Sequence, residues 1–182
     1  MDKKINVWKS DALFVVPFWK TKVNNFKVKK KNIEKVLRSY SEKPTQLQTF
    51  ASNRGSNFIE PFREVFQEEL NGFATTIKKH CGITDVWSTS YKTGDYHPYH
   101  SHGNKGLSGI IYLTLKDKMP HTVFVNGDPD WVTGHTQYYD MEVTEGDMVI
   151  VPSHVGHFTP HNLSKQVKKI LAFDLKIIDE KG

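Results

Sequence analysis

Short apolar runs separated by turn residues fill the second half of the chain, and this pattern constrains the fold more than any other feature. The runs are four to six residues long and rich in β-branched and aromatic side chains: 86–91, 110–115, 122–125, 138–143, 148–151 and 170–175. Glycine, asparagine, aspartate and proline stand between them, as in Asn126–Pro129 and Glu145–Asp147. Many short strands at this spacing predict a β-sandwich or a β-barrel.

The first part of the chain, to about residue 83, predicts helices and loops instead. After Glu60–Pro61, apolar residues recur every three or four positions, which places them on one face of a helix that ends before Gly82: Phe62, Val65, Phe66, Leu70, Phe73 and Ile77. A shorter helix is predicted from Asn32, as its N-cap, to Leu37. Residues 41–57 predict a long loop. The fold class that follows is α+β.

Composition narrows the class of protein further. The 182 residues are 37% hydrophobic and 25% charged, which is typical of one folded domain. The apolar runs are far shorter than the roughly 20 residues of a membrane span. The first residues do not resemble a signal peptide, and Cys81 is the single cysteine. We therefore expect a cytoplasmic protein without a membrane partner.

The formal net charge of +5 raises the question of nucleic-acid binding, because lysines gather between Lys20 and Lys31. Such runs usually form a solvated face, and a basic surface can equally steer an anionic co-substrate. The chain contains no nucleic-acid-binding motif. A nucleic-acid partner is therefore not expected, and the sequence leaves the oligomeric state open.

Three of the nine histidines fall within residues 96–102, and two of these have the spacing of a metal site. Side chains at positions i and i+2 of an extended chain project from the same face, so His100 and His102 can bind one ion. His157 follows the run 148–151 and is the candidate third ligand. Neutral imidazoles suit Fe(II), zinc, copper and nickel, so ligand type alone does not define the metal.

Other interpretations of the histidines stay open. His97 can replace or support His100, and a carboxylate such as Asp95 is an alternative to His102. We interpret the remaining five as surface or hydrogen-bonding residues: His80, His121, His135, His154 and His161.

The order of these motifs resembles the 2-oxoglutarate and Fe(II)-dependent oxygenases, in particular the bacterial and phage branch related to the prolyl hydroxylases. The matching residues are Trp87, Gly94–His97, His100–Asn104, Leu107–Leu113, Glu145–Ser153, His157 and Lys168–Asp174, and the resemblance covers residues 86–178. It implies one oxygenase domain over residues 1–182. Residues 84–178 would form a double-stranded β-helix, that is, a jelly-roll or cupin-like core. Helices from the mainly helical and loop part, residues 1–83, would buttress one sheet.

The resemblance also implies roles for individual residues. The superfamily binds iron through His-x-Asp or His-x-Glu and a distal histidine. His102 takes the place of the carboxylate, as His-x-His does in this branch, so the implied ligands are His100, His102 and His157. A His-x-His site has one negative charge fewer than a His-x-Asp or His-x-Glu site.

For the co-substrate, the resemblance implies that Lys168 pairs with the far carboxylate of 2-oxoglutarate. Lys169 is the alternative if the strand register is shifted by one. Tyr91, and more weakly Tyr99, are implied contacts of the co-substrate.

The implied function is a 2-oxoglutarate-dependent dioxygenase that hydroxylates a protein side chain or a small molecule and releases succinate and CO2. Two alternatives stay open. One is a three-histidine cupin-type dioxygenase without 2-oxoglutarate, in which Lys168 would have no role, and the other is a non-catalytic jelly-roll binding protein. The sequence does not define the substrate, although Gln46–Thr49 and Asp128–Val132, with Trp131, are candidate recognition loops.

Overall fold

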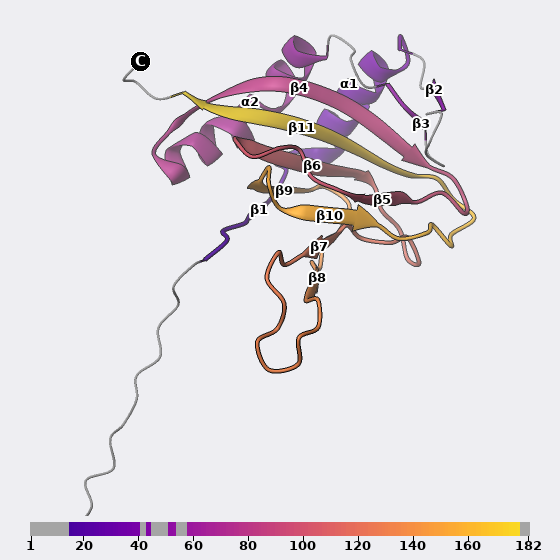
Figure 1. Ribbon diagram of the computed structural model, residues 1–182. Helices are drawn as coiled ribbons and strands as arrows, with labels where there is room; N and C mark the ends of the chain where they lie inside the picture. Colours follow the sequence, from indigo (N-terminus) through magenta and orange to yellow (C-terminus); the bar gives the residue numbers. More distant parts are fainter. Residues whose placement is uncertain (1–14, 41–42, 45–50, 54–57, 179–182) are drawn as a thin grey trace, which may run out of the picture.

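The computed structural model describes residues 15–40, 43–44, 51–53 and 58–178 (Figure 1). In chain order, its elements are β1 (Trp19–Lys22), α1 (Phe26–Leu37), β2 (Lys43–Pro44), β3 (Ala51–Ser52), α2 (Ile59–Ile77), β4 (His80–Tyr91), β5 (His97–His100), β6 (Leu107–Thr114), β7 (Val123–Val125), β8 (Tyr138–Asp140), β9 (Asp147–Pro152), β10 (Gly156–Thr159) and β11 (Lys168–Ile178). None of the helices in these ranges is long and apolar enough to cross a membrane.

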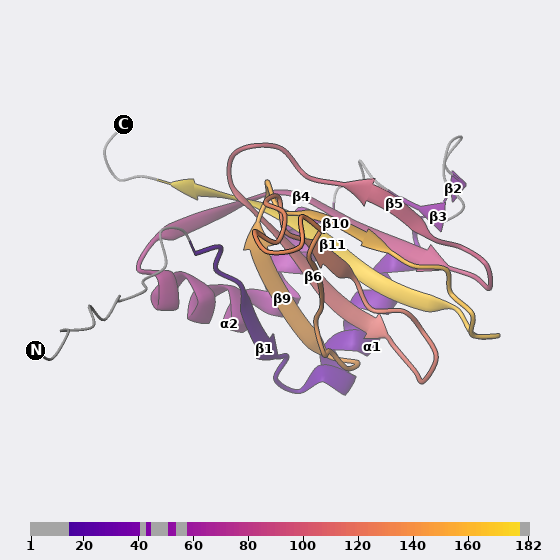
Figure 2. The same ribbon diagram turned by 60° about the horizontal axis from the view of Figure 1, so that its bottom comes forward.

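Two antiparallel sheets form the body of the molecule. The larger sheet has seven strands in the order β1-β9-β6-β11-β4-β3-β2, and the smaller has four in the order β5-β10-β7-β8. The helices α1 and α2 cover one face of the large sheet, and the small sheet lies on the opposite side (Figures 1 and 2). This arrangement confirms the predicted double-stranded β-helix with buttressing helices.

The central strands of the large sheet are buried on both faces, because alternate side chains enter two separate cores. In β11, Leu171 and Phe173 join the core formed with α1 and α2, whereas Ile170 joins the core between the two sheets. The Phe173 ring packs 5.0 Å from the Phe62 ring of α2. Gly109 of β6 makes room for it, since a Cβ atom there would lie 2.0 Å from the Phe173 ring. The helices therefore pack on and stabilise one face of the large sheet, and the opposite face is available for a functional site.

The start of α1 and the end of α2 differ from the prediction. Helix α1 begins at Phe26 rather than after Asn32, and its N-cap is Asn25 in the left-handed conformation, with φ of 49°. Lysines occupy many of the positions between Phe26 and Ile33, so the apolar residues on one face of this helix are difficult to recognise in the sequence. Helix α2 ends at Ile77, and its C-cap Lys78 has a φ of 53°, so Gly82 lies inside β4 and does not close the helix.

Several strands were not predicted from the sequence. β1 lies in the part predicted to be helical and pairs with β9, with Trp19 opposite Ile150. It is a mostly exposed edge strand, so its polar residues carry no alternating signal. β2 and β3 fall within the predicted loop 41–57, whereas Gln46–Thr49 lies outside the described residues. β5 and β10 were missed because they contain histidines and glycine in place of aliphatic residues.

Candidate active site

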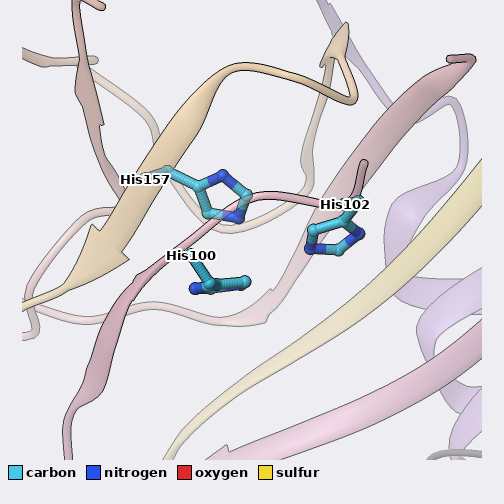
Figure 3. A group of neighbouring side chains, drawn as sticks. All are labelled: His100, His102 and His157. Atoms are coloured by element: carbon cyan, nitrogen blue, oxygen red, sulfur yellow. The ribbon is translucent and has the colours of Figure 1, made fainter. Parts of the chain in front are cut away.

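Three histidines meet on the inner side of the small sheet. β5 and β10 are antiparallel neighbours, and their register sets His100 opposite His157. His102 follows β5, and its backbone N–H donates to the Ser153 carbonyl at 2.9 Å, which holds this segment beside the end of β9. One candidate ligand atom from each histidine lies within 4.8 Å of the other two, and Figure 3 shows the three rings gathered together.

The hydrogen bonds of two of these rings show which nitrogen faces a metal. His100 Nδ1 lies 2.8 Å from the Pro98 carbonyl oxygen, and His157 Nδ1 lies 3.0 Å from the Val155 carbonyl oxygen. A carbonyl can only accept, so each Nδ1 carries the proton of the neutral ring. Nε2 then has the lone pair that a metal needs. The donor set therefore fits a divalent transition metal, with each ring oriented before an ion binds.

His102 is oriented in a third way. Its Nδ1 lies 2.7 Å from Oδ1 of Asp174, on β11, and its ring stacks on Trp87 of β4 with 5.4 Å between ring centroids. A carboxylate accepts the Nδ1 proton as a carbonyl would, so Nε2 of this ring also presents a lone pair.

Burial keeps His157 in the form that binds metal. Loss of hydration in the core lowers the pKa of His157 to about 3, and the neighbouring His100 contributes to the same shift. The imidazole is therefore neutral throughout the physiological pH range, and no proton has to leave before it coordinates.

A pocket opens beside the three rings, between the two sheets. Its lining comes from alternate residues of β4, β6, β9 and β11 on one side and from β7 and β10 on the other, and it includes Trp87, Thr89, Tyr91, Ile110, Thr122, Phe124, Val149, Val151, Thr159, Ile170 and Ala172. Most of these side chains are apolar. Such walls exclude water and strengthen electrostatic interactions inside the pocket.

Lys168 is a buried cation next to this pocket. Its side chain is 0% exposed, and among the described residues no hydrogen-bond acceptor contacts its Nζ. Nζ lies 5.0 Å from the ring centroid of Tyr91, which lines the pocket, and 5.7 Å from that of Tyr112. Burial lowers the pKa of Lys168 to about 7. A buried ammonium is costly unless it is paired, so this geometry suits an anionic ligand.

The alternative site residues have other positions. His97 lines the pocket and stacks on His100 at 3.9 Å, but its Nδ1 lies 3.3 Å from the Tyr91 hydroxyl, and it is not one of the three grouped histidines. Asp95 accepts the Lys92 backbone N–H at 2.7 Å within a turn. Lys169 alternates with Lys168 along β11 and so faces the helix side of the sheet.

Of the two tyrosines, the structure brings only Tyr91 to the pocket. Tyr99 is 63% exposed and covers Gly156, where a Cβ atom would lie 2.2 Å from its hydroxyl. It is not part of the pocket lining in the described part of the chain.

Sequence reasoning missed two residues of this region, Asp174 and Thr122. Asp174 could have been found, because Lys168, Ile170, Ala172 and Asp174 alternate along one strand and therefore share its inner face. Thr122 gave no such signal. It is buried in the pocket wall, but it is a common residue at the start of a predicted strand.

A double-stranded β-helix with three grouped histidines in a pocket and a buried lysine beside it is the arrangement expected of metal-dependent oxygenases that use a 2-oxo acid. Residues 85–174 match the family described as "Putative 2OG-Fe(II) oxygenase". This part of the chain belongs to the 2-oxoglutarate and Fe(II)-dependent oxygenase superfamily, as its motifs predicted. The comparison with curated protein sequences gave no match.

Solved structures of this superfamily share the fold at low sequence identity. An oxidoreductase of the 2OG-Fe(II) oxygenase family from Burkholderia pseudomallei is 9% identical, with a TM-score of 0.63, over 81% of this chain and 77% of its own. HygX from Streptomyces hygroscopicus, solved with nickel, 2-oxoglutarate and hygromycin B, is 10% identical, with a TM-score of 0.68, over 88% and 83%. A prolyl-4-hydroxylase from Pseudomonas putida is 9% identical, with a TM-score of 0.60, over 87% and 92%.

Proposed function

We propose that this protein is an Fe(II)- and 2-oxoglutarate-dependent hydroxylase whose metal is held by Nε2 of His100, His102 and His157. The observation that carries the proposal is the buried Lys168, whose Nζ has no hydrogen-bond partner in the described part of the chain, beside a pocket lined by the three grouped histidines. A metal site accounts for the histidines, and an anionic co-substrate gives the lysine a charged partner.

The chain's own residues bind and orient the co-substrate. Lys168 donates hydrogen bonds to the far carboxylate of 2-oxoglutarate, and the bound carboxylate keeps the ammonium protonated. The Tyr91 hydroxyl and the buried Thr122 line the same pocket and supply further polar contacts. The apolar side chains of Phe124 and Val149 exclude water from the reacting end.

Bound Fe(II) supplies the oxygen chemistry, in which 2-oxoglutarate, O2 and a substrate C–H group give succinate, CO2 and a C–OH group. His100 and His157, on the paired strands β5 and β10, would hold the ion together with His102. The His97 ring, stacked on His100, limits the directions from which a substrate can approach.

For the substrate, we propose a protein side chain or a small molecule that contacts the segment between β7 and β8. This segment projects away from the two sheets (Figure 1) and presents Trp131, which is 93% exposed. Phe124, on the strand that leads into the segment, lines the pocket. HygX was solved with the small molecule hygromycin B, and the Pseudomonas putida relative is a prolyl-4-hydroxylase, so the fold admits both kinds of substrate.

The two alternative functions fit Lys168 less well. A three-histidine dioxygenase that uses no 2-oxo acid needs the metal ligands but no buried cation. A non-catalytic binding protein needs neither oriented imidazoles nor a dry pocket. Neither function requires an anionic partner for Lys168.

The test is anaerobic reconstitution with Fe(II), followed by addition of O2 and 2-oxoglutarate and measurement of succinate with and without candidate substrates. Native protein is expected to form succinate only when both Fe(II) and 2-oxoglutarate are present, and His157→Ala to form none. His154→Ala is the matched control, since His154 is exposed and lies outside the pocket lining. Tight metal binding without any 2-oxoglutarate turnover would instead favour the three-histidine dioxygenase.

A further inference from the structure

Three neutral imidazoles give a bound dication no negative charge, yet a carboxylate lies directly behind one of them. Asp174 is on the inner face of β11, and its Oδ1 is 2.7 Å from His102 Nδ1. Its side chain is 21% exposed, and that of His102 is 7% exposed, so solvent screens their interaction only partly.

Two serines hold this carboxylate in place. Ser108 of β6 donates to the same Oδ1 atom at 2.7 Å, and the Ser108 hydroxyl lies 3.0 Å from the Ser153 hydroxyl. Both serines are nearly buried, at 5% and 3% exposure. Strand pairing fixes the geometry, because Asp174 is opposite Ser108 in the register of β11 and β6. The carboxylate thus has a defined position before any metal binds.

The Trp87 ring restricts His102 from its other side. It stacks on the imidazole at an interplanar angle of 28°. With Nδ1 bonded to Asp174 and one ring face against Trp87, the His102 imidazole has a single orientation, in which Nε2 points away from Asp174. That nitrogen belongs to the side on which His100 and His157 lie.

We propose that Asp174 is a positioning residue for the metal, which accepts the Nδ1 proton of His102 and thereby supplies the negative charge that the three ligands lack. This inference rests on the proposed function, because it takes the three histidines to be the metal ligands. The hydrogen bond fixes the tautomer of the His102 imidazole and makes its Nε2 a stronger electron-pair donor to a metal. Only the His102 ring would separate the carboxylate charge from the ion. Ser108 and Ser153 keep the carboxylate aimed at the ring.

The test is anaerobic calorimetry with Co(II), a stable substitute for Fe(II), on the full chain. Asp174→Asn keeps an oxygen that can accept the same hydrogen bond but removes the charge. It is expected to lower Co(II) affinity by about 10- to 100-fold, the usual effect of losing such a partner of a ligand. Ser108→Ala, which only loosens the carboxylate, is expected to lower it less.

Asp85→Asn is the matched control. Asp85 is opposite Asp174 in the register of β4 and β11, and its Oδ1 accepts the backbone N–H of Val86. The variant removes the same charge from the neighbouring strand, where the carboxylate accepts a backbone N–H. Its Co(II) affinity is expected to stay within about threefold of native, because Asp85 is only half-buried and solvent screens its charge.

The outcomes separate the inference from the proposed function. If native protein binds no Co(II), the proposed function fails. If native protein binds Co(II) and Asp174→Asn binds it equally well, or Asp85→Asn loses as much affinity as Asp174→Asn, the inference alone is overturned. Thermal unfolding of the metal-free variants checks their folding. If Asp174→Asn does not fold, Ser108→Ala decides, and affinity equal to native then overturns the inference.

Discussion

Lys168 illustrates at the scale of one residue how burial prepares a chain for a ligand. An ordinary lysine stays protonated well above neutral pH, but burial lowers the pKa of Lys168 to about 7. Between pH 7 and its ordinary value of 10.5, the folded protein therefore holds fewer protons than the unfolded chain. The sign follows: the unliganded protein gains stability as the pH rises through this range.

The same pKa predicts proton uptake when 2-oxoglutarate binds. At pH 8 much of Lys168 is neutral in the unliganded protein, and the incoming carboxylate favours the ammonium, so binding should take up as much as about one proton and weaken as the pH rises further. Calorimetry in two buffers of different ionisation enthalpy measures the uptake. In Lys168→Met the uptake should vanish, and affinity should fall about 10- to 100-fold, as expected for loss of a charged hydrogen bond. Lys169→Met is the control, and equal losses in both variants would contradict the assignment.

A second prediction at this scale separates the ligands from the other histidine in the pocket. His102→Ala should lose most metal affinity, because two imidazoles hold an ion far less well than three, whereas His97→Ala should retain affinity within about tenfold. Anaerobic calorimetry with Co(II) measures both. Loss in His97→Ala with retention in His102→Ala would make His97 the third ligand.

The two-residue period of an extended chain was enough to predict that His100 and His102 share a face, whereas His157 was proposed from its position after a strand and from the family resemblance. The structure brings the three histidines together. The hydrogen bond from His102 to Asp174 was not predictable in the same way. It joins residues 72 positions apart, and it depends on the register of β11 against the rest of the large sheet.

At the scale of elements, strands rich in aliphatic residues were predicted, whereas β5 and β10, which carry histidines of the site, were not. The sequences of β6, β9 and β11 clearly predict strands, because both faces of these strands are buried and are therefore mostly apolar. β5 reads His-Pro-Tyr-His and β10 reads Gly-His-Phe-Thr. Their histidines and glycine replace the β-branched residues that normally mark a strand. Their pairing becomes visible only in three dimensions.

A prediction at this scale concerns the packing of β6 against β11. Gly109→Ala would place a methyl group in the Phe173 ring, and overpacking of this kind costs about 1–3 kcal/mol. For a chain of this length, each kcal/mol lowers the melting temperature by roughly 2–4 °C. Thermal unfolding followed by circular dichroism measures the change. Gly127→Ala is the control, since nothing lies within 4 Å of its added carbon, and an unchanged melting temperature in Gly109→Ala would contradict the packing.

The segment between β7 and β8 supports a further prediction. Asp130 orders it by accepting the backbone N–H groups of Val132 and Thr133 at 3.0 and 2.7 Å, so Trp131 is presented on a structured loop. Trp131→Ala should raise the KM for a substrate found in the succinate assay by about tenfold, while substrate-free 2-oxoglutarate turnover and metal binding stay unchanged. Steady-state kinetics checks this. An unchanged KM would exclude Trp131 from substrate binding.

At the scale of the whole molecule, the two faces of the large sheet have separate tasks. The helix side is an aromatic and aliphatic core. The inner side carries Asp174 and Lys168 and, with the small sheet, encloses a second core and the three histidines. Because both faces belong to the same strands, the packing of α1 and α2 fixes the positions of Lys168 and Asp174 on β11. A rigid support of this kind is what a site with three oriented ligands requires.

The central claim is that one pocket holds Fe(II) on three histidines and 2-oxoglutarate on Lys168. Anaerobic titration of 2-oxoglutarate into the Fe(II)-loaded protein tests it most directly, with the visible absorption of Fe(II) chelated by a 2-oxo acid as the signal. The account predicts a saturable band in native protein, a much weaker apparent affinity in Lys168→Met, and no band in His157→Ala. A protein that binds Fe(II) tightly but gives no such band at saturating 2-oxoglutarate would contradict the account.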